Sequence, residues 1–183
     1  PSSTLSDVRK LLAIRKGDTS MILQVKYLEG RLNYTGRELS PHFILEHYSL
    51  HGSALVAARG GCDVPTAHLV DWEDRLANDR IGAGEMLHFL GEFFERPLRE
   101  GVWIQRQLVA LAGEILRNSW HCPVVRTGDD LWVADRKLTV SIVAPTLASC
   151  VLHLGMNIDP SGAPVPAIGL AELKVDPERF AHQ

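Results

Sequence analysis

The hydrophobic positions change their spacing several times along the chain, and each change predicts an element of secondary structure. Runs of apolar and β-branched residues predict strands over residues 21–28 and 53–59. Residues 85–94 alternate only weakly, and a strand is favoured there. Residues 62–84 are mixed and rich in turn-forming residues, so no regular element is expected in them.

Helical spacing is clearest in the second third of the chain. Apolar residues share one face between residues 101 and 118, which predicts the longest helix (Val102, Leu108, Leu111, Ala112, Ile115 and Leu116). A shorter helix is expected over residues 40–52, because Ser40 suits the cap and Pro41 the first helical position. A last short helix is expected over residues 176–181, by the same argument from Asp176 and Pro177.

Four short extended runs occupy much of the rest of the chain, at residues 122–126, 131–134, 137–145 and 149–158. The turn-forming triplets Gly128-Asp129-Asp130 and Ala134-Asp135-Arg136 separate the first three, as in antiparallel hairpins. Together with the helices, this pattern predicts an α/β (α+β) fold. Its sheet would be mixed but mostly antiparallel, with helices packed on it.

Length and composition favour a single domain. The chain has 183 residues, enough to bury a core without disulfide or metal staples. Residues 1–20 are polar except for one short amphipathic piece, so we expect an extension there and a folded domain over residues 21–183. The sequence does not indicate an oligomeric state.

Charge and cysteine content narrow the functional classes. The net charge is −3 with 22% charged residues, which argues against broad binding to nucleic acid or to an anionic membrane. No apolar run approaches the ~20 residues of a membrane span, and residues 1–20 lack the apolar core of a signal peptide. Three widely spaced cysteines without a CxxC pair fit reduced thiols, and a cytoplasmic location is expected.

Candidate chemistry gathers around one lysine. Lys137 stands where a polar turn meets an apolar strand, so it either marks a strand edge or reaches towards an anion. Arg59-Gly60-Gly61 follows a buried strand, where it is either a plain turn or an anion-binding loop. Asp129 and Asp130 either form an ordinary turn or hold a hydrated Mg²⁺.

Other titratable residues have simpler interpretations. His68, Asp71, Glu73, Asp74 and His88 lack the spacing of a known metal motif, and a solvated acidic face is favoured over a metal cluster. His153 alternates with apolar residues and is expected to pack in the sheet. Cys62 is interpreted as a small buried residue rather than a nucleophile.

The order of elements from residue 121 onwards resembles that of biotin–protein ligases and lipoate ligases. The matching pieces are the aspartate turn at 127–130, the strand at 131–133, Lys137-Leu138 and Leu154-Gly155-Met156-Asn157. Residues 167–173 are similar to the ligases' tail segment, and Arg59-Gly60-Gly61 stands where their glycine-rich ligand loop lies. The whole chain is similar to the family called domain of unknown function 366, which we associate with the same fold group.

The resemblance implies a ligand-binding site formed by Arg59, Gly60, Gly61, Asp130 and Lys137. Those ligases join a carboxylate to the α-phosphate of ATP and pass the acyl group to a lysine of an acceptor protein, so ATP and Mg²⁺ are the implied cofactors. Lys137 would be the catalytic cation between carboxylate and phosphate.

Two functions follow from the resemblance. The first is binding of a small carboxylate or a nucleotide, with acyl-adenylate formation or acyl transfer if the protein is an enzyme. The alternative is a non-catalytic ligand-binding or interaction module. Three residues depart from the ligases: Thr139 and Val140 stand where small residues are usual, and Asp129 replaces an asparagine. Open space beside Val140 would favour the enzyme, and a filled pocket the interaction module.

Overall fold

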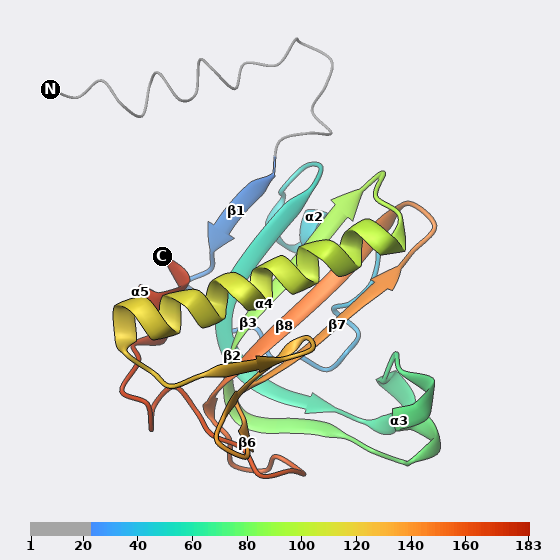
Figure 1. Cartoon of the computed structure of the whole chain (residues 1–183). Helices are drawn as coiled ribbons and strands as arrows, with labels where there is room; N and C mark the ends of the chain where they lie inside the picture. Colours follow the sequence, from blue (N-terminus) through green and yellow to red (C-terminus); the bar gives the residue numbers. More distant parts are fainter. Residues whose placement is uncertain (1–22) are drawn as a thin grey trace, which may run out of the picture.

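The computed structural model describes residues 23–183. The expected extension at residues 1–20 and the expected domain start at Met21 lie outside the described residues. The main sheet has five strands in the order β1-β2-β3-β8-β7 (Figure 1). These strands are β1 (Gln24–Tyr27), β2 (Ala54–Val64), β3 (Ile81–Phe94), β8 (Ser149–Asp159) and β7 (Thr139–Pro145). Only the β1–β2 pair is parallel, so the expected mixed, mostly antiparallel sheet is confirmed.

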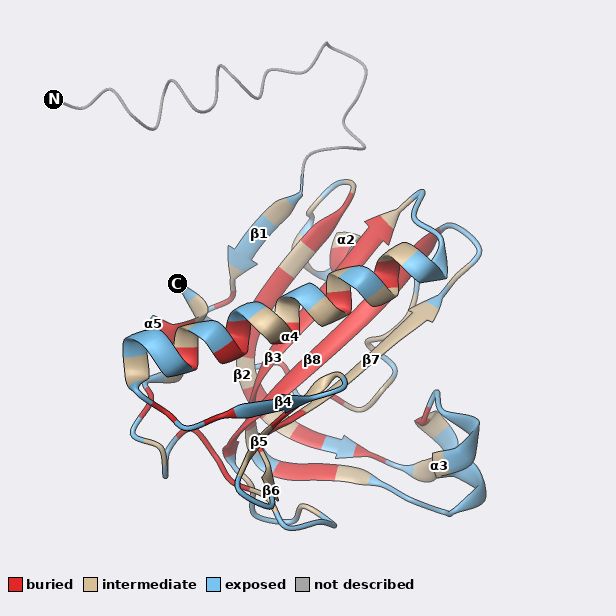
Figure 2. Ribbon diagram, viewed as in Figure 1, coloured by how far each residue is buried: buried red, intermediate tan, exposed pale blue. Residues whose placement is uncertain are grey.

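One long helix covers one face of this sheet. Helix α4 (Leu98–Trp120) starts three residues earlier and ends two residues later than the apolar stripe predicts. Its buried positions form a single stripe towards β8 and β7, as Figure 2 shows. At Gly101 the helix approaches so closely that an added Cβ would lie 2.2 Å from the Cys150 Sγ atom. The close approach explains why glycine stands at this buried helical position.

The opposite face is covered by the segment between β1 and β2. This segment contains the short helix α2 (Phe43–Tyr48), which is shorter than the helix expected over residues 40–52. Its apolar residues, among them Leu32, Tyr34 and Ile44, pack against Val56 and Leu90 of the sheet. The sheet therefore has a hydrophobic core on each of its two faces.

The strands β2 and β3 are longer than predicted and form an extended hairpin. Residues 60–64 and 81–84 continue these strands, although the sequence predicts no regular element over 62–84. Between them lie the 3₁₀ turn η2 (Thr66–His68) and the short helix α3 (Trp72–Leu76), which Figure 1 shows at the far end of the hairpin. Glycines at 60, 61, 82 and 84 obscure the strand pattern because glycine is a weak strand former.

A smaller sheet lies beside the end of β7. It consists of β4 (Val125–Thr127), β5 (Asp130–Val133) and β6 (Arg136–Lys137), which form the predicted antiparallel meander. The sequence predicts one strand over 137–145, but the structure divides it at Leu138 into β6 and β7. The expected C-terminal helix is present as α5 (Pro177–Ala181), capped by Asp176. Within residues 23–183, no helix is both long and apolar enough to cross a membrane.

Candidate functional site

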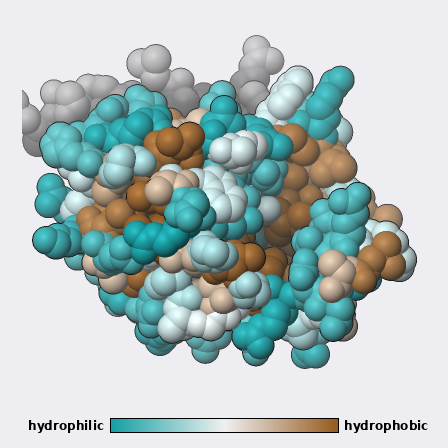
Figure 3. Space-filling model, turned by 60° about the horizontal axis from the view of Figure 1, so that its bottom comes forward, coloured by the Kyte–Doolittle hydropathy of each residue, from teal (hydrophilic) through white to brown (hydrophobic). Residues whose placement is uncertain are grey.

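A cavity of about 240 Å³ lies where β6, β7 and the end of β8 meet. Asp130 and Lys137 both line it, and the Lys137 Nζ atom lies 2.8 Å from the Asp130 Oδ2 atom. The side chains of the lysine and the aspartate are 26% and 18% exposed. Figure 3 shows hydrophobic side chains recessed between hydrophilic ones at this end of the molecule.

The backbone of Lys137 is held by hydrogen bonds at both its N–H and its carbonyl, which fixes where its side chain begins. Its N–H donates to the Pro166 carbonyl and its carbonyl accepts from the Ile168 N–H, at 2.9 and 3.0 Å. The Asn157 side chain also donates to the Lys137 carbonyl, at 3.2 Å. Although β6 is the last strand of the smaller sheet, residues 166–168 thus pair with its outer edge at Lys137, and the side chain emerges from a hydrogen-bonded segment.

Asp130 positions the ammonium group from across the hairpin. Burial raises the pKa of the Asp130 carboxyl, while the neighbouring Lys137 ammonium acts in the opposite direction. An ammonium group has three N–H donors, so a lysine paired with one carboxylate retains donors for a second anion. Lys137 also lies over the Trp132 ring, 5.8 Å from its centroid, which further restricts the side chain.

Asp129 is engaged differently from its neighbour. Its carboxylate accepts from Gln105 at 3.0 Å and lies 3.5 Å from an Arg106 nitrogen, both on α4. Ser141 donates to its backbone carbonyl. In the described part of the chain, no group of three His, Cys, Asp or Glu side chains is arranged to hold a metal ion. The two aspartates that the sequence offers for a turn or a hydrated Mg²⁺ are thus engaged by different protein groups, Asp129 by α4 and Asp130 by Lys137.

A second cavity of about 150 Å³ adjoins the first, and Val140, Asp74 and Ile81 are among the residues that line both. The space beside Val140 is thus open. The two cavities are lined by two cations, Arg80 and Lys137, and by five aspartates. The aspartates are Asp71, Asp74, Asp79, Asp129 and Asp130. Burial, together with Asp71 and Asp79, raises the pKa of Asp74. This excess of negative charge does not fit a free triphosphate.

Arg59, Gly60 and Gly61 do not line the cavity that contains Lys137. They belong to strand β2, where the sequence predicts a turn or loop after residue 59. The Arg59 guanidinium pairs with Glu85 at 2.9 Å, in a separate surface hollow with Arg31 and Glu178. The five residues expected to form one site are therefore divided between two regions, and only Asp130 and Lys137 share a cavity.

Several polar groups near the cavities were not selected by sequence reasoning. The Asn157 Oδ1 atom is buried without a hydrogen-bond partner among the described residues, next to Lys137. His153, expected only to pack in the sheet, is 1% exposed and lines the smaller cavity. Asp74 lies on α3 and lines both cavities. Residues 153 and 157 are four apart on one strand, so their side chains point to the same face of the sheet. This even spacing is the sequence signal that places them at one site.

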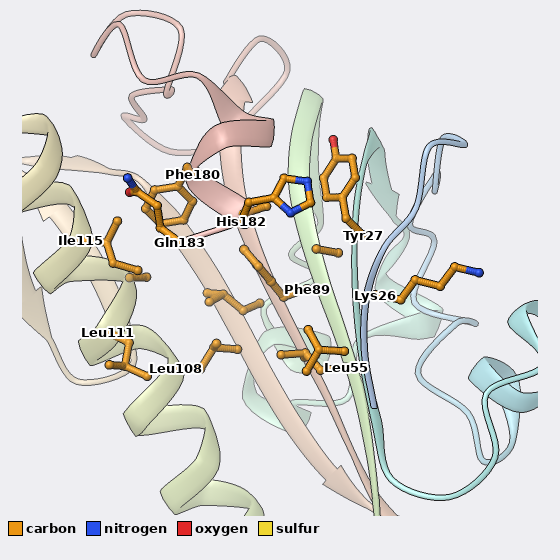
Figure 4. A pocket seen from close by; sticks show the side chains of 15 residues that line it. Lys26, Tyr27, Leu55, Phe89, Leu108, Leu111, Ile115, Phe180, His182 and Gln183 are labelled. Atoms are coloured by element: carbon orange, nitrogen blue, oxygen red, sulfur yellow. The ribbon is translucent and has the colours of Figure 1, made fainter. Parts of the chain in front are cut away.

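Another cavity lies on the other side of the sheet and has different chemistry. It measures about 410 Å³ between α4, β1 and α5, and Figure 4 shows Leu55, Phe89, Leu108 and Phe180 around it. Lys26 and His182 are the titratable side chains other than Tyr27 on its walls. None of the candidate site residues named from the sequence lines this cavity, and its walls offer few groups that could fix a polar ligand.

Comparison with known proteins agrees with this fold. The family described as "Domain of unknown function (DUF366)" matches residues 23–183. An uncharacterised protein of Methanocaldococcus jannaschii is 30% identical over 159 residues, 84% of this chain and 72% of that protein. A solved protein of unknown function from Pyrococcus horikoshi has a TM-score of 0.84 and 33% identity, over 88% of this chain and 87% of that chain.

Protein ligases are similar in fold but distant in sequence. A biotin protein ligase from Aquifex aeolicus, solved with biotin and ATP, has a TM-score of 0.52 at 14% identity, over 86% of this chain and 65% of that chain. Lipoate-protein ligase A, solved with ATP, has a TM-score of 0.51 at 10% identity, over 87% of this chain and 81% of that chain. The expected ligase-like fold is confirmed, and identities this low carry no further conclusion.

Proposed function

The chain belongs to the DUF366 family, and we propose that it binds a small carboxylate at the cavity lined by Lys137 and Asp130. The observation that carries this proposal is the ion pair of these two residues inside a concave, partly apolar cavity. A pocket with apolar walls and a few fixed polar groups is the usual form of a small-molecule site. Lys137 is the cation that would contact the carboxylate, and Asp130 would hold it in place.

The polarity of the site favours a carboxylate over a nucleotide. A single carboxylate can share the ammonium group with Asp130, because each anion then accepts different N–H donors. A triphosphate would bring several negative charges among five aspartates. The ligase resemblance supports acyl-adenylate formation or acyl transfer to an acceptor protein as the reaction. We therefore propose that the cavity binds a carboxylate, and the experiment below also tests whether it binds a nucleotide.

Thermal-shift measurements test the proposal directly. Biotin, lipoate and hexanoate are each compared with the corresponding methyl ester or amide, and ATP is added with and without Mg²⁺. A ligand at about 100 times its Kd raises the free energy of unfolding by about 2.7 kcal/mol. We expect stabilisation by a free acid and none by its ester.

Matched lysine variants locate the effect. In Lys137→Ala the stabilisation should disappear, whereas in Lys26→Ala, a lysine that lines the other large cavity, it should be retained. Equal shifts in wild type and Lys137→Ala would remove Lys137 from the site. If no acid or nucleotide stabilises the wild type, the alternative of an interaction module is favoured.

A further inference from the structure

A buried histidine pair lies on the sheet face beside the smaller cavity. The His88 Nδ1 and His153 Nε2 atoms are 3.0 Å apart, and the His88 Nε2 atom lies 3.2 Å from the Gly60 carbonyl oxygen. His88 is 0% and His153 1% exposed. The His153 ring also stacks on Tyr34, with centroids 3.6 Å apart and planes 9° from parallel. Neither ring has freedom to turn in this arrangement.

The backbone carbonyl determines where the protons lie. A carbonyl oxygen only accepts, so His88 must carry a proton on Nε2. Burial lowers the pKa of His88 to about 4 and that of His153 well below its usual value, so both rings are neutral at pH 7. A neutral imidazole has one donor and one acceptor. His88 Nδ1 is then an acceptor, His153 Nε2 donates to it, and His153 Nδ1 is left as an acceptor.

This last nitrogen has no hydrogen-bond partner among residues 23–183. His153 lines the cavity of about 150 Å³, together with Asp71, Asp74 and Asp129. The Asp74 carboxylate likewise accepts no hydrogen bond from the described residues. The hydroxyl groups of Tyr34 and Ser141 also line this cavity, and Ser141 donates to the Asp129 carbonyl. Carboxylates and a bare imidazole nitrogen are all acceptors, so a ligand that bonds to His153 and Asp74 must supply a donor.

We infer that the smaller cavity is a subsite for an N–H donor group, which His153 recognises through its Nδ1 atom. The inference rests on the proposed function, because the same ligand would place its carboxylate at Lys137 and its donor end at His153. His153 and Asn157 lie on one face of β8 with Gly155 between them. Four strand residues span roughly 13 Å, which sets the scale of a ligand that reaches from one cavity to the other.

The first test reads the histidine tautomers in the wild-type protein without ligand. Long-range proton–nitrogen NMR spectra of the histidine side chains distinguish a protonated ring nitrogen from a bare one. We expect His153 to carry its proton on Nε2 and to have a bare Nδ1, with the same tautomer in His88. A proton on His153 Nδ1 would overturn the inference, whatever the outcome for Lys137.

The second test compares ligands with different ends. The probes are a homologous series of straight-chain monocarboxylates and two matched series that end in a primary amide or an ammonium group. One hydrogen bond to a buried acceptor favours the donor-ended probe by about five- to tenfold in Kd. A preference for the amide series indicates a neutral donor, and a preference for the ammonium series a cationic one. Either preference supports the subsite.

Two variants separate this inference from the proposed function. His153→Phe keeps a ring of similar size but removes the acceptor, and it should abolish the preference for donor-ended probes while retaining carboxylate binding. Lys137→Ala should weaken every series and retain the preference. If His153→Phe does not fold, the wild-type tautomer and the wild-type preference decide. Equal Kd values for all three series would overturn the subsite and leave the carboxylate site standing, whereas no binding by any series would overturn both.

Discussion

Acidification is expected to destabilise this protein well above the pH at which carboxylates titrate. The physical reason is the His88–His153 pair, which is buried in the neutral form. In the unfolded chain both histidines regain a pKa of about 6.5. Between their unfolded and folded pKa values the unfolded state binds more protons, so the free energy of unfolding falls as pH falls.

The magnitude follows from the shift of His88. With a pKa of about 4 in the folded protein and about 6.5 in the unfolded chain, one histidine lowers the free energy of unfolding by about 2 kcal/mol between pH 7 and pH 5. His153 has its pKa shifted in the same direction and adds a loss of the same sign. Asp74 and Asp130 have raised pKa values and act in the opposite direction, so a variant is needed to isolate the histidines.

The assay is urea unfolding at pH 7 and pH 5 at constant ionic strength, on three proteins. The wild type should lose about 2 kcal/mol over this interval, and His153→Phe should lose less than the wild type. His51→Gln, which changes an exposed histidine, should behave like the wild type. A wild-type free energy that stays constant from pH 7 to pH 5, or a His88 resonance that titrates near 6.5, would refute the reasoning.

Three further predictions concern single sites. Cys62 is buried, and burial raises the pKa of its thiol to about 12. It should therefore react with a thiol reagent at pH 7.5 only after denaturation, and fast labelling of the native protein would contradict this. Gly60→Ala should destabilise by about 1–3 kcal/mol or more, because its Cβ would lie 2.0 Å from the Leu32 carbonyl oxygen; Gly30→Ala, with open space around it, is the matched control in the same unfolding assay. A double-mutant cycle of Lys137→Ala and Asp130→Asn should give a coupling of about 1 kcal/mol, and a coupling of zero would show that the ion pair does not form in solution.

Much of the fold could be predicted because the decisive segments have clear periodicity. The stripe between residues 101 and 118 identified α4, and the meander from residue 122 identified the smaller sheet and β8. The strands predicted for β2 and β3 are shorter than the observed ones, because the glycine-rich ends of these strands have the composition of turns. Long-range pairing with a partner strand, which local patterns do not contain, holds these residues extended.

The candidate site could be predicted only in part, for a related reason. Lys137 and Asp130 are seven residues apart, and a hairpin between them brings their side chains together, so local sequence was sufficient. Arg59 was placed with them by resemblance to the ligases, but its partner Glu85 is supplied by the neighbouring strand. His153 was interpreted as a packing residue because nothing in the sequence reveals that His88 occupies its other ring nitrogen.

Val140 is a position at which this chain departs from the ligases that share its fold. A small residue at this place in the ligases leaves room for ligand, and valine was expected to reduce that room. Val140 instead lines two adjoining cavities, with Lys137 in one and His153 in the other. The branched side chain therefore borders both cavities and fills neither. The ligand that we propose reaches from Lys137 to His153 past Val140, and an unbranched acid with a donor group at its far end has the two polar ends that these cavities would bind.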